Sequence, residues 1–171
     1  MKNLVLLISL IILTNSFAQE KEYLVTLKND TVFGKIYRST NFTNPSKITF
    51  KIKDENGNKS LINPSEIKVI KSLKGVDGDC FIVPYNNQFY LKKIISGRIN
   101  VYQLINAAIL YVSKENSEIF ATDIGLFSRK KSKQQIRLLL ADNLEIVKEL
   151  DVLKGSSKNI LKLINKYNAM Y

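Results

Sequence analysis

The spacing of the apolar residues changes near residue 127, and this change constrains the fold more than any other feature of the sequence. Before it, apolar and polar residues mostly alternate, as in strands with one buried face. After it, apolar residues recur every three or four positions, as along one side of a helix. The order predicts an α+β domain: an antiparallel β-sheet or partly closed β-barrel body over 19–127, then a small C-terminal helical unit over 128–171 packed on the same domain.

Turn-forming residues divide the first part into strands. Asn29-Asp30, Asn56-Gly57 and Ser96-Gly97 each predict a tight turn between two strands. Pro84 has no backbone N–H to donate, so we expect its segment at a sheet edge or a strand end. Between 100 and 112 the apolar positions fit a helical face or two strands, and the many Val, Ile and Tyr residues favour strands. The expected strands are 23–27, 31–37, 47–53, 60–62, 66–72, 81–85, 89–95 and 98–104.

The helical unit is expected to contain three helices. Asp142 followed by Glu145 has the spacing of a capping box, which predicts the start of the second helix. Ser156 or Ser157 is expected to cap the third helix. The apolar stripes of the three helices contain Ile136, Leu139 and Leu140, then Leu144, Val147 and Leu150, and finally Ile160, Leu163, Ile164 and Tyr167.

Residues 1–18 have the order of a signal peptide. A lysine precedes the apolar stretch 4–13, and Ser16 and Ala18 are small residues before a cut between Ala18 and Gln19. The apolar stretch is about half as long as a bilayer-spanning helix. We therefore predict export, with no transmembrane segment in the mature chain and a final location in the periplasm, at the outer membrane or outside the cell. A buried first helix or an uncleaved anchor is the alternative interpretation.

Several segments together resemble a known group of proteins. The hairpin at 25–36, the segment 96–102, and the ending with 142–145 and 164–168 are similar, in order and approximate spacing, to a group of uncharacterised exported proteins of Bacteroidota-type Gram-negative bacteria. The residues before the predicted cut, 16–19, are also similar to theirs. The resemblance covers most of the mature chain and implies export and a strand-rich body with a helical end. It implies no catalytic, cofactor or ligand residues.

The residue types that are missing exclude several chemistries. The chain has no His and one Cys, so it has no Ser-His-Asp or Cys-His pair, no imidazole metal ligand and no internal disulfide. We expect no metal and no cofactor. Cys80 enters an apolar run and is most simply a small buried residue, with an intermolecular disulfide or a reactive thiol as the alternative. Apolar residues make up 45% and charged residues 24%, which is typical of a globular domain.

A cluster of basic residues marks the start of the helical unit. Arg129, Lys130, Lys131 and Lys133 are candidate binding residues for an anionic partner, and a solvated helix start is the alternative. Positive charge near a helix N-terminus is unfavourable, which suggests that these basic residues are present for a reason other than helix stability. Of the 26 basic residues, 25 remain after the predicted cut, against 15 acidic ones, a net charge of +10. We expect no nucleic-acid partner, because an exported protein leaves the compartment that holds nucleic acids.

Carboxylates in predicted turns raise the possibility of an enzyme. Asp77 and Asp79 flank Gly78, which suits a calcium ligand pair, acid/base chemistry or simply a solvated turn. Other turns carry Asp54-Glu55 and the pair Glu115 and Glu118. A pair of carboxylates is the catalytic set of most glycosidases, so a periplasmic carboxylate-dependent hydrolase acting on glycans is the alternative function.

Aromatic residues and one threonine suggest two further roles. Tyr85, Phe89, Tyr90 and Tyr102 fall around the central hairpins, where they would either stack on sugar rings or pack in the core. Asp30-Thr31-Val32 is similar to the Asp-Thr-aliphatic pattern that such bacteria O-glycosylate in the periplasm, so Thr31 is a candidate modification site.

These patterns favour an exported protein without enzymatic activity. The leading hypothesis is a binding or envelope-associated module that contacts an envelope protein or an anionic envelope component through sheet edges or the basic helical end. The hydrolase is the second hypothesis, and a purely structural or stress-related envelope protein is the third. No residue is identified as catalytic.

Overall fold

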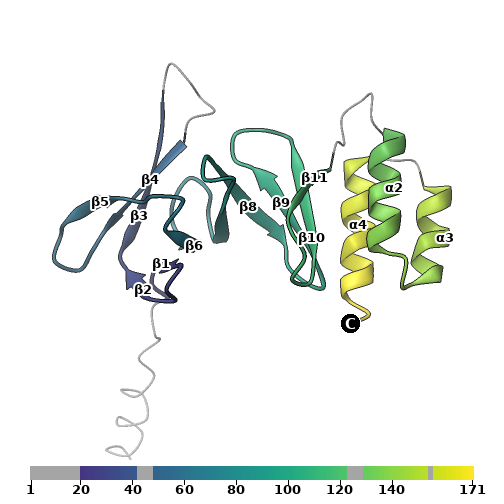
Figure 1. Ribbon diagram of the computed structural model, residues 1–171, viewed down its shortest axis with the longest axis horizontal. Coiled ribbons are helices and arrows are strands. Elements are labelled where there is room, and N and C mark those ends of the chain that lie inside the picture. Colours follow the sequence, from purple (N-terminus) through teal and green to yellow (C-terminus); the bar gives the residue numbers. More distant parts are fainter. Residues whose placement is uncertain (1–19, 42–47, 123–128, 154–155) are drawn as a thin grey trace, which may run out of the picture.

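The computed structural model describes residues 20–41, 48–122, 129–153 and 156–171. Figure 1 shows a small three-stranded sheet at one end of the molecule, a larger sheet in the middle and three helices at the other end. The strands all precede the helices in the sequence, so the predicted α+β class and its order are confirmed.

The elements follow one another without long insertions in the described residues. The strands are β1 (Tyr23–Thr26), β2 (Thr31–Phe33), β3 (Lys35–Thr40), β4 (Ile48–Lys53), β5 (Lys59–Leu61), β6 (Ile67–Ser72), β7 (Cys80–Tyr85), β8 (Phe89–Ile95), β9 (Ile99–Leu104), β10 (Leu110–Lys114) and β11 (Phe120–Thr122). The helices are α2 (Arg129–Leu139), α3 (Leu144–Val152) and α4 (Ser157–Asn168).

The larger sheet has eight antiparallel strands in the order β11-β10-β9-β8-β7-β6-β1-β2. It is an open sheet with β2 and β11 at its edges. Of the two predicted forms of the body, the antiparallel sheet is therefore the one observed, and not the partly closed barrel. The ambiguous stretch forms two strands, β9 and β10, as preferred from its composition. Pro84 lies next to the end of β7, beyond the residues that pair with β6, so its missing N–H leaves that pairing intact.

The single strand expected over 31–37 is wrong, because the chain changes sheets at Gly34. Residues before it form β2 on the edge of the larger sheet, and residues after it form β3 in the three-stranded sheet. A Cβ atom at Gly34 would lie 2.5 Å from the backbone oxygen of Lys53. Only glycine therefore allows the backbone to pass this close to β4.

Two hydrophobic cores hold the parts of the molecule together. The first lies between the two sheets and includes Ile36, Phe50 and Ile52 from one and Ile70 and Ile82 from the other. The second lies between the larger sheet and the helices. Its residues are Ile99, Val101, Val112, Ile136, Leu140, Ile146, Val147, Leu150, Ile160, Leu163, Ile164 and Tyr167. The apolar stripes predicted for the helices supply most of this second core.

The larger sheet is strongly curled around a third, smaller cluster. The rings of Tyr85 on β7 and Tyr111 on β10 are 4.9 Å apart between centroids. Two strands separate β7 from β10, so in a flat sheet these positions would be roughly 14 Å apart. The contact therefore requires the sheet to bend toward this face, where Leu91, Tyr102 and Tyr111 are buried.

The second helix begins one residue later than the capping-box spacing predicts. Asn143, not Asp142, is the N-cap of α3, and its side-chain oxygen accepts a hydrogen bond from the backbone N of Ile146 at 3.1 Å. The prediction for the third helix is confirmed with Ser156 as the cap, which accepts from the backbone N of Asn159 at 3.2 Å.

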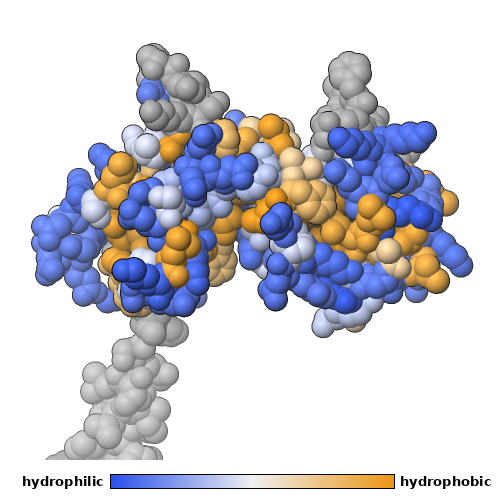
Figure 2. All heavy atoms as spheres, viewed as in Figure 1, coloured by the Kyte–Doolittle hydropathy of each residue, from blue (hydrophilic) through white to orange (hydrophobic). Residues whose placement is uncertain are grey.

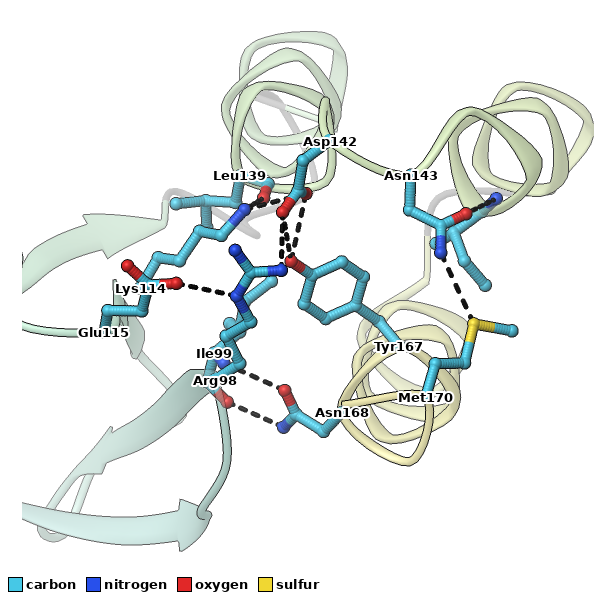
Figure 3. A network of polar contacts seen from close by, with 11 residues as sticks. Arg98, Ile99, Lys114, Glu115, Leu139, Asp142, Asn143, Tyr167, Asn168 and Met170 are labelled. Carbon is cyan, nitrogen blue, oxygen red and sulfur yellow. Dashed lines mark hydrogen bonds and ion pairs between the residues drawn. The ribbon is translucent and has the colours of Figure 1, made fainter.

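Asp142 instead joins the helices to the sheet (Figure 3). Its carboxylate accepts a hydrogen bond from the Tyr167 hydroxyl at 2.8 Å and forms ion pairs with Arg98 and Lys114, each at 2.8 Å. Burial raises the pKa of Asp142, but the hydrogen bonds from Lys114 and Tyr167 and the nearby positive charges lower it by more. The pKa of Asp142 is therefore below its usual value. Asp142 is therefore a charged connector at neutral pH.

Asn168 forms a second connection between helix and sheet. Its side-chain amide accepts from the backbone N of Ile99 at 2.9 Å and donates to the backbone oxygen of the same residue at 2.8 Å (Figure 3). A Cβ atom on Gly97 would meet this side chain at 2.4 Å. The Ser96-Gly97 turn therefore also leaves room for the last turn of α4.

Cys80 is buried in the core between the two sheets, as predicted from its apolar surroundings. Burial raises the pKa of its thiol, which keeps the group protonated and unreactive at neutral pH. Cys80 therefore contributes to the fold by packing.

Replacing Gly34 tests how the small sheet is attached. Gly34→Ala places a Cβ against the backbone of Lys53, and we expect it to lower the free energy of unfolding by about 2 kcal/mol. Gly75→Ala is the milder comparison: its Cβ would lie 3.3 Å from the side-chain oxygen of Ser72, not against backbone, so we expect a smaller loss. Urea unfolding measures both variants. A Gly34→Ala midpoint equal to that of the wild type would contradict the close approach.

Candidate functional site

One face of the three-stranded sheet is turned away from the core and carries four lysines. Alternate residues of β4 face the core, which leaves Lys51 and Lys53 exposed on the other side. The antiparallel register places Lys35 and Lys59 directly beside Lys53, one on each neighbouring strand. We call this surface the basic face. Its outward residues are Lys35, Tyr37, Ser39, Thr49, Lys51, Lys53, Lys59 and Leu61, and Figure 2 shows hydrophilic side chains gathered at this end of the molecule.

The row of Lys35, Lys53 and Lys59 is unfavourable for the sheet. Like charges on directly opposite cross-strand positions repel one another and destabilise the pairing. The ring of Tyr37 offsets part of this repulsion, because the ammonium groups of Lys35 and Lys59 each lie 5.3 Å from its centroid. Cation–π contacts at exposed sites contribute only about 0.5–1 kcal/mol. Sheet stability alone therefore does not account for three lysines in one row.

The charge of the basic face is not neutralised within the described residues. Its four lysines form no ion pair there. Asp54 and Glu55 lie in the adjoining β4–β5 turn, but both have other partners. Asp54 accepts from the backbone N of Asn58 at 2.8 Å, and Glu55 pairs with Lys21 at 2.9 Å. The basic face is thus a concentrated positive surface.

A cleft of about 600 Å³ opens along β3 at the border of the basic face. Lys35, Tyr37 and Lys53 belong to both the basic face and the cleft wall, and Phe33 adds an aromatic ring that is 48% exposed. Four lysines and four carboxylates line the cleft, so its charge is balanced. Lys35 and Lys53 therefore share the cleft with carboxylates, whereas Lys51 and Lys59 are basic-face lysines outside the cleft lining.

Glu22 lines the cleft and connects the two sheets. Its carboxylate accepts hydrogen bonds at 2.8 Å from the backbone N of Ile36 on β3 and from that of Leu73, the residue after β6. Burial raises the pKa of Glu22, but the backbone hydrogen bonds from Leu73, Ile36 and Lys74 and the one from Ser72 lower it by more. Its pKa is therefore below the usual value, and the charged form holds the sheets together.

The basic cluster predicted at the start of the helical unit has mixed roles. Lys133 donates through Nζ to the backbone oxygens of Asp151 at 2.8 Å and Leu153 at 3.4 Å, so it caps the last turn of α3. Lys130 and Lys131 are exposed on the first turn of α2. Arg129 begins that helix, and its side chain lies outside the described residues. At least one of the four predicted binding residues thus has a structural contact.

Several of the predicted carboxylates form structural contacts, whereas Glu118 is exposed. The Asp77 side chain is only 9% exposed and pairs with Arg38 of β3, so the interpretation of Asp77 as solvated is wrong. Asp79 pairs with Lys71, and Glu115 accepts from Arg98 at 2.6 Å. Within the described ranges, no group of three or more His, Cys, Asp or Glu side chains is arranged to hold a metal ion.

The four predicted aromatic residues lie in three different places. Tyr90 belongs to the core, where its ring meets Phe50 edge-on at 4.7 Å, and burial raises its pKa to about 12. Tyr85 and Tyr102 line the curled side of the larger sheet. Phe89 is partly exposed in a groove of about 540 Å³ between the two sheets. They do not form one stacking surface.

Thr31 is exposed on the edge strand β2, next to the β1–β2 turn. This position leaves its hydroxyl open to solvent, and its glycosylation stays a prediction. The predicted cleavage residues, Ala18 and Gln19, lie outside the described part of the chain.

The basic face is the site that the sequence predictions missed, although a signal for it was present. The alternation at 47–53 assigns Lys51 and Lys53 to the polar side of their strand. The Asn56-Gly57 turn then pairs Lys53 with Lys59. Only Lys35 required the long-range register of β3 with β4. The turn and the alternation together would have identified three of the four lysines of the site.

Comparison with family models, curated proteins and solved structures finds no match to this chain. A proposal about function must therefore be based on the geometry of the chain's own side chains. Within that geometry, the basic face is the largest group of like-charged side chains without ion pairs among those described above.

The hydrogen bonds that Glu22 accepts from both sheets predict a pH effect on stability. The pKa of Glu22 in the folded state is below its ordinary, unfolded value, so its contribution to stability is complete above the unfolded pKa and is lost as the pH falls through the folded-state pKa. At neutral pH we expect Glu22→Gln to cost on the order of 1 kcal/mol, since the carboxylate is partly solvated. The stability difference from the wild type should shrink in acid. Unfolding curves at neutral and acidic pH test this, and a difference independent of pH would contradict it.

The lysine row predicts a substitution that stabilises the protein. Lys53→Glu changes three like charges into an alternating row, and we expect it to raise the free energy of unfolding by about 0.5 kcal/mol at low salt. Salt screens exposed charges, so the gain should fall at high ionic strength. Lys53→Gln should give a smaller gain. Urea unfolding at two salt concentrations measures this, and a destabilised Lys53→Glu variant would contradict the repulsion.

Proposed function

We propose that this protein is an exported binding module without enzymatic activity, and that it binds an anionic component of the cell envelope through the basic face. The observation that carries the proposal is the in-register row of Lys35, Lys53 and Lys59, with Lys51 in the next row. Repulsion within the row lowers the stability of the sheet, and the same three charges would attract an anionic partner.

The state of the carboxylates supports binding rather than hydrolysis. A glycosidase needs a general acid whose pKa is raised so that it holds a proton near neutral pH. Glu22 and Asp142 are carboxyls whose pKa is displaced, and both are displaced downward. Asp77, a candidate for acid/base chemistry, is paired with Arg38. These contacts suit groups that hold the fold together.

The sequence supports the exported location. The leader pattern at 1–18 and the small residues before Gln19 are typical of a cleaved signal peptide. Of the helices described, none has the length and apolar character to cross a membrane. The basic face of an exported protein would therefore meet anionic components of the envelope.

Two variants with equal charge loss test the proposal. The first replaces the four lysines of the basic face with Gln at Lys35, Lys51, Lys53 and Lys59. The second replaces four exposed lysines of the helical unit, Lys130, Lys131, Lys148 and Lys158. Both remove four positive charges, so a difference between them reports the site and not the net charge. Binding to soluble polygalacturonate is measured at low and high salt.

We expect the basic-face variant to bind polygalacturonate roughly tenfold or more weakly than the wild type at low salt, because four counter-ion contacts are lost. The helical variant should stay close to the wild type. Equal losses in both variants, or a larger loss in the helical one, would contradict the basic face as the binding site.

A further inference from the structure

The basic face combines its lysines with exposed apolar side chains. Leu61 is 64% exposed, and the register places it directly beside Lys51. Tyr37 lies on the other side of Lys51, so the middle row of the face reads Tyr, Lys, Leu across the three strands. Phe33, 48% exposed, lies just before β3 and shares the cleft with Lys35. Apolar and basic groups thus occur together on one surface.

The lysines are spread in two directions rather than along one line. Lys35, Lys53 and Lys59 cross the sheet from strand to strand, about 4.8 Å apart. Lys51 lies two residues before Lys53 on β4, about 7 Å from it. A linear polyanion presents its charges along a chain and fits a groove. A lipid surface presents its charges in two dimensions, which matches lysines spread both across and along the outer side of one sheet.

The residue types also match those that bind at a membrane surface. Lysines near anionic headgroups are attracted to them, and exposed Leu and Phe side chains insert at the boundary between headgroups and acyl chains. Tyr rings favour the same depth because one end is apolar and the other polar. Binding to such a surface grows with both the buried apolar area and the electrostatic attraction, and the basic face offers both.

We infer that the anionic component bound by the basic face is a lipid bilayer surface with anionic headgroups, and that Leu61 enters the interfacial layer when the lysines bind. This inference rests on the proposed function, since it identifies the partner of the same site. Lys35, Lys51, Lys53 and Lys59 supply the attraction, and Leu61 supplies the contact that a soluble polyanion does not use.

A single tryptophan reports the insertion directly. The chain contains no Trp, so Leu61→Trp introduces one fluorophore on the basic face. Leu138→Trp is the matched control, because Leu138 is 72% exposed on α2, in the helical unit. Each variant of the exported chain is mixed with vesicles of pure phosphatidylcholine and with vesicles in which a third of the lipid is phosphatidylglycerol.

We expect the emission of Leu61→Trp to shift to the blue with the anionic vesicles only, and that of Leu138→Trp to stay unchanged. Adding Lys51→Gln and Lys53→Gln to Leu61→Trp should weaken vesicle binding about 30-fold, at about fivefold per lysine. Adding Lys130→Gln and Lys131→Gln instead should change it less than twofold. Cosedimentation of the wild type with the same vesicles controls for the added Trp.

Binding to polygalacturonate separates the possible failures. If the polymer binds through the basic-face lysines but the anionic vesicles do not bind, the lipid inference is wrong and the proposed function stands. If neither probe binds, both are wrong. If vesicles bind without a shift of the Trp at position 61, or through Lys130 and Lys131, the assignment of the membrane contact to the basic face is overturned.

Discussion

The structure depends on the burial of one side of the three-stranded sheet. A strand has two faces, so packing Phe50 and Ile52 against the larger sheet forces Lys51 and Lys53 to the opposite side. The hairpin that follows adds Lys59 in register, and β3 adds Lys35. The same core contacts that stabilise the sheet therefore bring the lysines together. Any change that shifted the register by one residue would exchange the two faces and disperse the charge.

Three further contacts keep this small sheet in place. Gly34 lets the chain pass close to β4, and Glu22 accepts backbone hydrogen bonds from both sheets. Arg38, on the inner side of β3, pairs with the nearly buried Asp77 of the larger sheet's β6–β7 loop. At the other end of the molecule, Asp142 and Asn168 attach the helices. The helical unit completes a core, and the three-stranded sheet presents the charged surface.

Much of the fold could be predicted from local patterns, because alternation and turn chemistry act over a few residues. The Asn29-Asp30 and Asn56-Gly57 turns and the apolar stripes of the helices are examples. Predictions failed where a distant contact decides the outcome. The split at Gly34 depends on the approach of β4, and Asp142 pairs with Arg98 and Lys114 of the sheet while Asn143 caps the helix.

The candidate site was harder to predict for the same reason. The basic cluster near Lys131 is conspicuous because its charges are adjacent in the sequence, yet Lys133 caps a neighbouring helix. The lysines of the basic face are separated by up to 24 positions, from 35 to 59, and only strand pairing unites them. A search for charges adjacent in the sequence misses this cluster, and Lys35 joins it only through the pairing of β3 with β4.

Binding through the basic face requires that this surface meets the anionic partner. Lysine acetylation followed by mass spectrometry tests it on the unmodified chain, with and without anionic vesicles. We expect the vesicles to protect Lys35, Lys51, Lys53 and Lys59 from acetylation, while Lys130 and Lys131 react at an unchanged rate. Protection of Lys130 and Lys131 with the four basic-face lysines still reactive would contradict it.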